Sequence, residues 1–492
     1  MSYANPRHRG RLIVIDVVKD AFAEVSVLNA PNGSVSVPLE GTDHPVLINK
    51  KIEHLVREPE RHLYNFPFLF LSNGVPWIEA NSYLLYTVGK NFYKKRPTDN
   101  VRRRAAKLLD YLLFCEETGI DWLDFSGARP SSRPTYQYFN SLRTRVDLSA
   151  AVVNQYTGVI YDFYLYVSKN WHSLDMGRVD KVTTFNFLLN SAYGSKVLRK
   201  SKRSQTQATA PTSTVAIGYV RDEGEDLRPL ANKELAELLS TIRGYKWSVL
   251  ERLIIFLSLM TGARKQTVLT LRLNQLKGFE GDPDANGTYS IYAGPGTGVD
   301  TKNDTPQRLY VPWQLAQDLL VYSNSPVAKG RREKFREKWK REHPGLRQLS
   351  DGDMYVFLSD QGGSYYMAAD DPRYDFIKSP PTGQVTDNLK KKLLSLADKG
   401  FPRDFTFHWL RATFAFQVYQ RLQPLLASGA IRYGEEISFI QSRMHHKSRE
   451  TTECYLKLFL MHSDKLLAQE AYEEHLLGFG KYSDLSVSEY EP

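Results

Sequence analysis

The stretch LIIFLSLMTGARKQTVLTLRL, residues 253–273, constrains the fold of this chain more than any other stretch. Its first eight residues are apolar except for Ser258, which predicts a buried helix. Thr261 and Gly262 interrupt the apolar run, and a second apolar-rich segment follows. Arg264 is therefore expected at a turn between two buried elements. A guanidinium there requires an anion, either a bound ligand or an acidic neighbour in a structural salt bridge.

The bulk properties of the chain limit its class. Its 492 residues exceed a single hydrophobic core and predict about two to four domains. A net charge of +10 favours a polyanionic partner, with nucleic acid ahead of a membrane surface. The cysteines are Cys115 and Cys454, too few for a disulfide framework or a cysteine-rich zinc site, which predicts a reducing compartment. The apolar run at 66–71 is too short to span a membrane, so we expect a soluble protein.

The N-terminal half changes period near residue 78. Residues 1–77 alternate apolar and polar positions, which predicts short strands joined by a hairpin at a Pro-Asn-Gly turn, in a module whose role the sequence leaves open. Residues 78–175 follow a helical period. The apolar stripes of two expected helices are Val101, Ala105, Leu108, Leu109 and Leu112, then Val152, Tyr156, Ile160, Phe163 and Val167.

Basic residues flank these elements. Arg102, Arg103, Arg104 and Lys107 lie beside the first stripe, and they are either solvated or contact DNA phosphates. Residues 196–215 are polar and basic without periodicity, which predicts an irregular linker between domains. Its cations, including Lys200, Lys202 and Arg203, are either solvated or cross a duplex backbone.

A second domain is expected from about residue 228, where Asn232 is a plausible N-cap of an amphipathic helix. Residues 328–343 interleave Lys and Arg with Phe335 and Trp339, which indicates an exposed basic helix that is either a DNA contact or an insertion without a role. The stretch 466–479 is amphipathic and acidic and suits docking on a protein surface. The expected domains are 1–77, 78–175, a linker over 176–227, a domain over 228–462 and a tail over 463–492.

Three further motifs carry polar chemistry. His408 and Arg411 lie three residues apart on one helical face, so both tips reach one point, a pair suited to a phosphate or, alternatively, an ordinary surface pair. Two strand-like runs, TYSIYA and QRLYVP, flank a Gly-rich connection that carries Lys302. This lysine is either a proton donor or a surface residue without a functional role. Finally, the stretch MHHKSRETTECYL sets His446 nine positions ahead of Tyr455.

In this order the motifs resemble the tyrosine recombinases, the phage integrase family of site-specific DNA recombinases. The resemblance covers about 228–462, and residues 78–175 look like the family's core-binding domain. It implies a multidomain, mainly α fold, with a helical, SAM-like core-binding domain and a mixed α+β catalytic domain holding a small antiparallel sheet. The matching positions are Thr261, Gly262, Arg264, Lys302, His408, Leu410, Arg411, Met444, His446, Ser448, Thr451, Thr452 and Tyr455.

The resemblance also implies roles for these residues. Arg264, Arg411 and His446 would hold a phosphate, Tyr455 would attack it, His408 would take the phenolic proton, and Lys302 would protonate the leaving 5′-oxygen. The reaction would need no metal, ATP or cofactor, and would integrate or excise a mobile element in the cytoplasm or nucleoid of a prokaryotic cell. The implied partner is double-stranded DNA, bound by a homotetramer on two sites or by a dimer at each site.

The sequence departs from the family pattern at three places, the first of which is a gap from Lys302 to Arg308 that is one residue longer than usual. Thr267 stands where members carry an acidic residue, so support for Arg264 is expected from elsewhere. His445 replaces the glycine before the last histidine, which leaves open whether His445 or His446 faces the phosphate. Three alternatives remain open: a type IB topoisomerase, a telomere resolvase, and a DNA-binding regulator that has lost activity.

Overall fold

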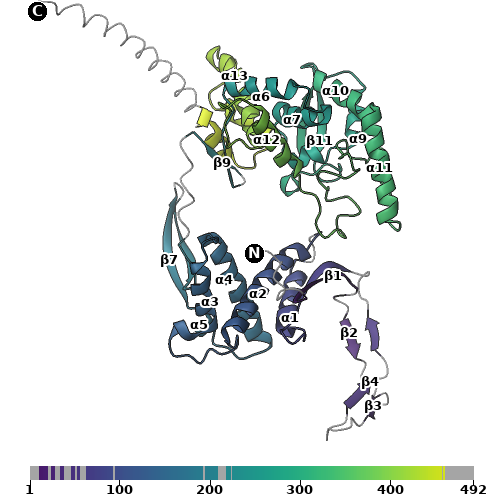
Figure 1. Cartoon of the computed structure of the whole chain (residues 1–492). Helices are drawn as coiled ribbons and strands as arrows, with labels where there is room; N and C mark the ends of the chain where they lie inside the picture. Colours follow the sequence, from purple (N-terminus) through teal and green to yellow (C-terminus); the bar gives the residue numbers. More distant parts are fainter. Residues whose placement is uncertain are drawn as a thin grey trace, which may run out of the picture. The chain divides into compact units, whose positions relative to one another are not determined.

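The computed structural model describes residues 10–19, 21, 24–27, 34–37, 46–49, 52–55, 62–91, 95–191, 194–208, 218–222, 224–456 and 458–459. The chain divides into two compact units, each described here by itself. The first comprises residues up to Thr212 together with Asp375–Lys378, and the second comprises Ser213–Tyr374 and the chain from Ser379 onward. Both are mainly helical with two-stranded antiparallel sheets (Figure 1), so the predicted fold class is confirmed.

The N-terminal strands form nested antiparallel pairs. β1 (Leu12–Val18) pairs with β6 (Leu63–Leu69), β2 (Glu24–Val27) with β5 (Ile52–Leu55), and β3 (Ser34–Val37) with β4 (Val46–Asn49). The two strands that flank the Pro-Asn-Gly sequence therefore do not pair with each other, and the predicted hairpin is wrong. Short alternating strands specify their register weakly, so a local turn signal does not determine which strands pair. The Pro-Asn-Gly residues themselves lie outside the described part.

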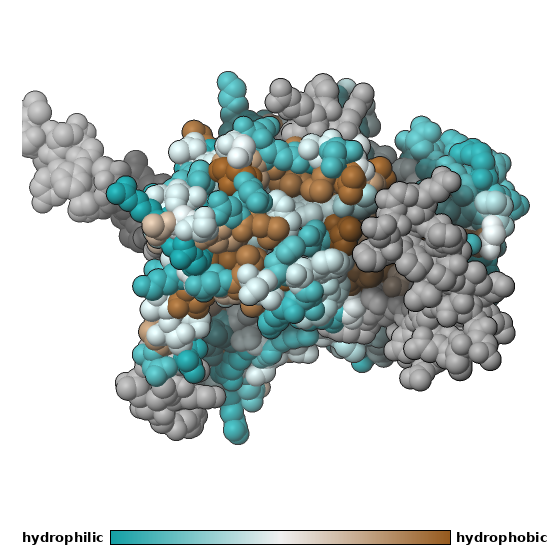
Figure 2. Space-filling view, turned by 90° about the horizontal axis from the view of Figure 1, so that it is seen from below, coloured by the Kyte–Doolittle hydropathy of each residue, from teal (hydrophilic) through white to brown (hydrophobic). Residues whose placement is uncertain are grey.

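Four longer helices form the core of the first unit: α1 (Ile78–Gly89), α2 (Thr98–Thr118), α3 (Pro134–Thr144) and α4 (Ala150–Asn170), followed by the short α5 (Met176–Val179). Ser149 caps α4 by accepting a hydrogen bond from Val152 N. The predicted stripe of α2 is buried throughout, and Ile160, Phe163 and Val167 of α4 pack in the same core. In the space-filling view of Figure 2, apolar residues appear as separate areas among hydrophilic ones.

A long two-stranded ribbon follows α5. β7 (Val182–Ser191) pairs antiparallel with β8 (Gly194–Arg203) along their whole length. Residues 196–203, which we expected to be irregular linker, are thus part of a strand. The facing strand begins with the β-branched and aromatic residues Val182, Thr183, Thr184 and Phe185, which favour a pleated conformation and give the basic strand a partner.

The second unit has one main hydrophobic core. Its helices are α6 (Asn232–Arg243), α7 (Val249–Thr261), α8 (Lys265–Leu269), α9 (Leu273–Leu276), α10 (Trp313–Asn324), α11 (Pro326–Glu342), α12 (Val385–Leu396), α13 (Trp409–Ala427) and α14 (Glu435–Met444), and residues 451–456 and 458–459 are also helical. Its strands pair as two hairpins, β9 (Val220–Asp222) with β10 (Glu225–Leu227) and β11 (Thr288–Ala293) with β12 (Gln307–Pro312). The second hairpin coincides with the two predicted runs.

The helix α7 ends as its sequence predicts. Gly262 adopts a left-handed conformation with φ of +68° and closes the helix. A Cβ atom at this glycine would lie 2.5 Å from a ring carbon of Phe414, so only glycine fits there. At α6 the expected N-cap is displaced by one residue, because Asn232 is the first helical residue and Ala231 N donates to the Glu234 carboxylate at 2.8 Å.

The basic segment at 328–343 is helical but not fully exposed. Phe335 and Trp339 of α11 are buried in a small separate cluster with Tyr355. Arg331 contacts Asp360, and Arg336 contacts Asp351. The aromatic face of α11 therefore docks on its own unit, and part of its positive charge is used in internal ion pairs. Across the described ranges, no helix combines the length and apolar character needed to cross a membrane.

Candidate active site

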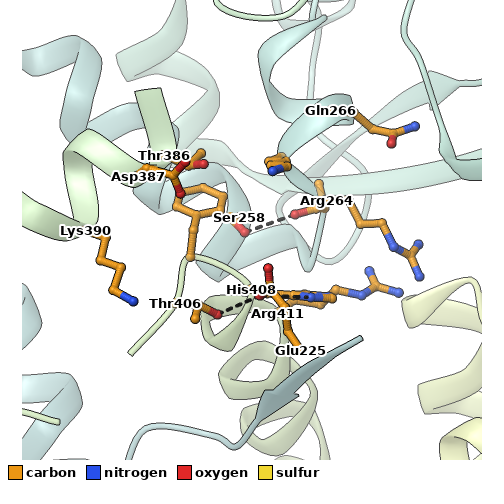
Figure 3. Close-up of a pocket in the computed structure, with 13 residues that line it drawn as sticks. Glu225, Ser258, Arg264, Gln266, Thr386, Asp387, Lys390, Thr406, His408 and Arg411 are labelled. Atoms are coloured by element: carbon orange, nitrogen blue, oxygen red, sulfur yellow. Dashed lines mark hydrogen bonds and ion pairs between the residues drawn. The ribbon is translucent and has the colours of Figure 1, made fainter. Parts of the chain in front are cut away.

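A cavity of about 440 Å³ in the second unit brings together three of the expected site residues. Arg264 follows the glycine turn after α7 and occupies the N-cap position of α8, as the sequence predicted. His408 immediately precedes α13, and Arg411 lies in the first turn of that helix. Figure 3 shows the guanidinium groups of Arg264 and Arg411 on the same side of the cavity. Arg264, His408 and Arg411 all line it.

Arg411 also ties distant motifs together. It is 2% exposed, and its two terminal nitrogens donate to the backbone oxygens of Gly262 and Met444. Gly262 belongs to the turn that carries Arg264, and Met444 ends the helix before His445 and His446. A single buried guanidinium therefore joins the three segments that carry Arg264, His408 and the paired histidines.

The two histidines at the end of α14 both lie near this positive charge. His445 has a φ of +51° and terminates the helix, whereas His446 is 8% exposed, with its Nδ1 3.1 Å from Thr452 Oγ1. Burial and then the charges of Arg411 and Arg264 lower the pKa of His446 to about 3. Burial and Arg411 likewise lower the pKa of His445 to about 4. Both imidazoles are thus neutral near pH 7.

The outer nitrogens of these imidazoles are potential donors to an anion. Within the described part of the chain, Nε2 of His445 and Nε2 of His446 are buried and lack a hydrogen-bond partner. At His446, a Thr452 hydroxyl that donates to Nδ1 would leave the proton on Nε2, which would then be a neutral donor. This arrangement connects His446 with the threonine of the final motif.

Tyr455 lies against His446 rather than in the cavity. Its side chain is fully buried at 0% exposure, and its ring centroid is 5.2 Å from that of the His446 imidazole. Phe459 packs on its other side with a centroid distance of 6.1 Å. The structure therefore places the Tyr455 ring against His446, and His445, His446 and Tyr455 are not among the residues that line the cavity.

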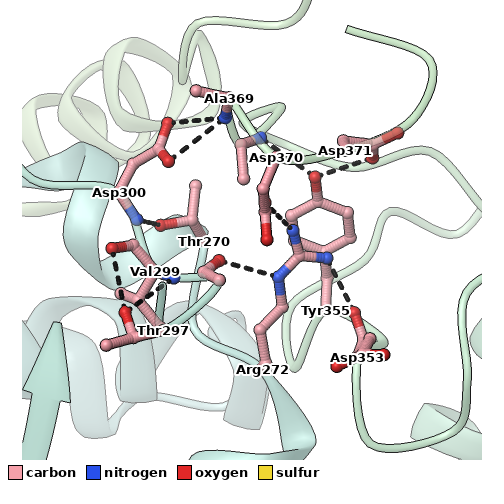
Figure 4. Close-up of polar contacts among 12 residues, drawn as sticks. Thr270, Arg272, Thr297, Val299, Asp300, Asp353, Tyr355, Ala369, Asp370 and Asp371 are labelled. Carbon is pink, nitrogen blue, oxygen red and sulfur yellow. Dashed lines mark hydrogen bonds and ion pairs between the residues drawn. The ribbon is translucent and has the colours of Figure 1, made fainter. Parts of the chain in front are cut away.

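Lys302 occupies the connection between β11 and β12, in a short turn over Lys302–Asp304. It is half-buried and is not among the residues that line the cavity. The loop that precedes it is firmly held (Figure 4). Arg272 donates to Gly298 O at 2.9 Å, and Ala369 N donates to both carboxylate oxygens of Asp300 at 3.0 and 3.1 Å. The contacts anchor the backbone that leads directly into the lysine.

The anchor is part of a larger buried polar cluster. The Arg272 guanidinium donates to Asp370 at 2.9 Å and lies 3.8 Å from the ring centroid of Tyr355. The Tyr355 hydroxyl donates to Asp371 at 2.8 Å. Burial raises the pKa of Asp300 to about 6, and the neighbouring Asp370 acts in the same direction. The loop before Lys302 is therefore held by a set of charges distinct from the cavity.

Several residues that line the cavity were not predicted from sequence, and among them Glu225 contacts an expected site residue. Glu225 on β10 accepts a hydrogen bond from Thr406 Oγ1 at 3.0 Å, and its carboxylate lies 4.0 Å from Nδ1 of His408 (Figure 3). Glu225 thereby supplies a carboxylate to the site. Thr267, which stands where members of the resembling family carry an acidic residue, is buried. No local signal could have found Glu225, because it is distant in sequence from His408.

The expected DNA-binding residues of the first unit divide into two groups. Arg104 contacts Tyr83 and Asp162, and Arg102 donates to Lys378 O at 2.6 Å within the same unit. Burial and the charge of Arg103 lower the pKa of Lys107, which lies 5.3 Å from the ring centroid of Tyr156. The exposed side chains are Arg103, Lys200 and Lys202, while Arg203 is half-buried.

Comparison with known proteins gives a consistent but weak likeness. No family model matches the chain, and no curated protein matches it. Among solved structures, XerH site-specific recombinase bound to its difH substrate is 15% identical, over 73% of this chain and 77% of that chain, with a TM-score of 0.39. The Tn1549 transposon integrase with transposon right end DNA is 15% identical, over 77% and 94%, with a TM-score of 0.39.

A third similar structure is a lambda integrase dimer bound to a core site, which is 11% identical over 76% of this chain and 94% of that chain, with a TM-score of 0.38. The comparison thus returns members of the family that the sequence motifs resemble.

Proposed function

We propose that this chain is a site-specific DNA recombinase that cuts and rejoins DNA through a 3′-phosphotyrosyl intermediate and so integrates or excises a mobile element. The observation that carries the proposal is that Arg411, which lines the cavity with Arg264 and His408, also donates to Met444 O directly before the paired histidines. Burial and the charge of Arg411 lower the pKa of His446 there. Side chains from motifs far apart in sequence act on one imidazole beside one cavity. A cluster of this sign and composition suits a single phosphodiester.

The two guanidiniums would bind the non-bridging oxygens of the scissile phosphate. Arginine presents several donors in a fixed plane, so it can stabilise the charge that develops on these oxygens in the transition state. Nε2 of His446, kept protonated by the contact between Nδ1 and Thr452, would donate a further hydrogen bond. Because Arg264 and Arg411 both line the cavity, these two donors would need little reorganisation during the reaction.

Tyr455 would supply the nucleophile. Its phenolic oxygen forms a bond to phosphorus as the bond to the 5′-oxygen breaks, His408 accepts the phenolic proton, and Lys302 gives a proton to the leaving 5′-oxygen. Because the phosphodiester is exchanged for a phosphotyrosyl ester, rejoining needs no ATP. Tyr455 is buried against His446, so its side chain has to move before its oxygen reaches the cavity.

The decisive experiment uses Tyr455→Phe and a nicked duplex made from the DNA that flanks the gene. Wild-type protein should form an adduct that survives a denaturing gel, and Tyr455→Phe should form none while binding the duplex as before. Tyr433→Phe is a matched control, because Tyr433 is 90% exposed and lies away from the cavity. An adduct with Tyr455→Phe would overturn the proposal.

Two further substrates, a pair of differently labelled duplexes and a supercoiled plasmid, distinguish related activities. A recombinase, acting as a tetramer on two duplexes, yields strands exchanged between two differently labelled duplexes. A type IB topoisomerase relaxes supercoiled plasmid without producing recombinant strands, and a silent regulator binds the duplex without forming an adduct.

A further inference from the structure

The ribbon formed by β7 and β8 carries positive charge that the proposed reaction does not use. Residues 182–203 contain no Asp or Glu, while β8 provides Lys196, Arg199, Lys200, Lys202 and Arg203. A ribbon with five cations and no carboxylate in its own sequence is complementary to a polyanion.

The base of this ribbon is fixed to the helices of the first unit. Arg203 Nη1 donates to Thr157 O at 2.8 Å and lies 3.5 Å from the Asp180 carboxylate. Asp180 is 2% exposed and also accepts from Ser204 Oγ at 2.7 Å. The buried Gln205 donates to Val179 O at 2.6 Å. Arg203 is therefore an anchor, and the ribbon leaves the helices from a rigid base (Figure 1).

The two faces of the ribbon beyond this anchor differ in chemistry. Residues directly opposite in an antiparallel pair share a face, and successive residues alternate between faces. One face pairs Thr184 with Ser201 and Asn186 with Arg199, and the other pairs Thr183 with Lys202 and Phe185 with Lys200. Thr184 Oγ1 and Ser201 Oγ lie 3.4 Å apart, as expected for neighbours on one face. All eight side chains are exposed.

The first face is suited to reading bases and the second to holding the backbone. The side chains of Asn186, Arg199, Thr184 and Ser201 are hydrogen-bonding groups. Asn can form paired hydrogen bonds with adenine and Arg with guanine at the edges exposed in the major groove. Lys200 and Lys202 on the opposite face are suited to phosphates, which give affinity without sequence information. A two-stranded ribbon fits the major groove of B-form DNA, which is about 12 Å wide.

We propose that the β7–β8 ribbon enters the major groove of the target duplex, where Asn186 and Arg199 read base edges and Lys200 and Lys202 contact phosphates. This inference rests on the proposed function, because it takes double-stranded DNA as the substrate. It assigns target recognition to an element outside the cavity and outside the helices of the first unit.

The test is a binding selection by the full chain from a pool of duplexes with a randomised centre. The double variant Asn186→Ala/Arg199→Ala should lose the base preference at one short block of adjacent positions. Its affinity for the wild-type consensus duplex should fall about ten- to a hundredfold, because bidentate base contacts are lost. Asn140→Ala/Arg143→Ala removes the same side-chain types from the exposed surface of α3 and should enrich the wild-type consensus.

The double variant Lys200→Ala/Lys202→Ala should behave differently. Its affinity should fall equally for the consensus duplex and for an unrelated duplex, and the slope of log K against log salt should decrease by about two. Circular dichroism and the melting temperature of each variant verify that the fold is kept. If Asn186→Ala/Arg199→Ala enriches the same consensus at wild-type affinity, the ribbon proposal is overturned while covalent cleavage by wild-type protein still upholds the recombinase. If wild-type protein binds no duplex, both proposals fail.

Discussion

Two regions of the second unit bury arginines, and they compensate the charge differently. In the polar cluster, Arg272 contacts Asp370, and Arg373 contacts Asp371 at 2.7 Å. Burial works against ionisation of Asp371, but the hydrogen bond and charge of Arg373 prevail and lower the pKa of its carboxyl. At the cavity, Arg411 donates hydrogen bonds to two neutral carbonyl oxygens. Burial and its positive charge lower the pKa values of His445 and His446.

The difference shows what a buried arginine can be used for. In the polar cluster, carboxylates neutralise the arginines, so the cluster is a structural network. This network anchors the loop that carries Lys302. At the cavity the positive potential extends to the histidines, where a phosphate would be stabilised. Substitutions in the polar cluster should therefore act mainly on stability, and substitutions at the cavity should act on catalysis as well.

The largest expected effects separate the two regions directly. Arg411→Ala should lower single-turnover cleavage about 10²–10³-fold, because a preorganised donor to the phosphate is lost. Duplex affinity should change far less. Arg373→Met should lower the free energy of unfolding by about 3–5 kcal/mol, because it leaves the buried Asp371 carboxylate without its cation.

Single-turnover rates, duplex binding and urea unfolding of both variants measure this contrast. Equal losses of cleavage and binding in Arg411→Ala would reduce that arginine to an ordinary phosphate contact. A cleavage defect without loss of stability in Arg373→Met would contradict the assignment of the polar cluster to structure.

The positions of several expected site residues could be predicted from sequence because their determinants are local. The apolar run of α7, the left-handed Gly262 and the paired runs of β11 and β12 fix the positions of Arg264 and Lys302 within a few residues of each signal. The His408 and Arg411 pair follows likewise from helical spacing. The roles of these residues remain predictions.

Other features depend on contacts between distant segments. The burial of Phe335 on α11 requires the cluster around Tyr355, and its arginines find Asp351 and Asp360 only in the folded unit. Glu225 reaches His408 from a strand far earlier in the chain. Such pairings have no periodicity to reveal them. The sequence of β8 does not show the alternation of apolar and polar residues that is typical of a strand, because its cations occupy both faces of the ribbon.

A second prediction tests whether the polar cluster serves catalysis through Lys302. Asp300→Asn weakens the hydrogen bonding between Ala369 N and the side chain at position 300, which anchors the loop before Lys302. Cleavage should slow about tenfold, which is less than the roughly 10²–10⁴-fold that a general acid itself contributes. A duplex with a 5′-bridging sulfur should restore the rate, because a thiolate leaves without protonation. Asp282→Asn, at an exposed position before β11, is the control. If Asp300→Asn also cleaves the sulfur-containing duplex slowly, the substitution affects a step other than proton donation to the leaving group.

The third prediction concerns pH, where the regions act with opposite signs. The lowered pKa of His446, about 3, contributes stability that is present above pH 6.5 and lost as pH falls towards 3. The raised pKa of Asp300, about 6, contributes stability that is present below pH 3.8 and lost as pH rises through 6. Each group changes the unfolding free energy by at most about 1.4 kcal/mol per pH unit.

Urea unfolding between pH 4.5 and 7.5 measures these slopes. His446→Gln should flatten the rise of stability with pH, and Asp300→Asn should steepen it. Sulfate, as a phosphate mimic, should stabilise the wild-type protein more at low pH, because an anion in the cavity favours the protonated imidazoles. Parallel curves for the wild-type protein and His446→Gln would show that this histidine does not experience the proposed potential.

The smallest expected effect comes from the one cavity carboxylate that contacts an imidazole. Glu225 is half exposed, and a 4.0 Å ion pair of that kind is worth about 0–1 kcal/mol, so Glu225→Gln should slow cleavage by up to about fivefold. Asp387→Asn makes the same charge change at another exposed residue of the cavity and should leave the rate unchanged. If both variants cleave faster because the cavity becomes more positive, Glu225 opposes the phosphate site. A slower Glu225→Gln beside a normal Asp387→Asn would show that Glu225 orients His408 for proton transfer.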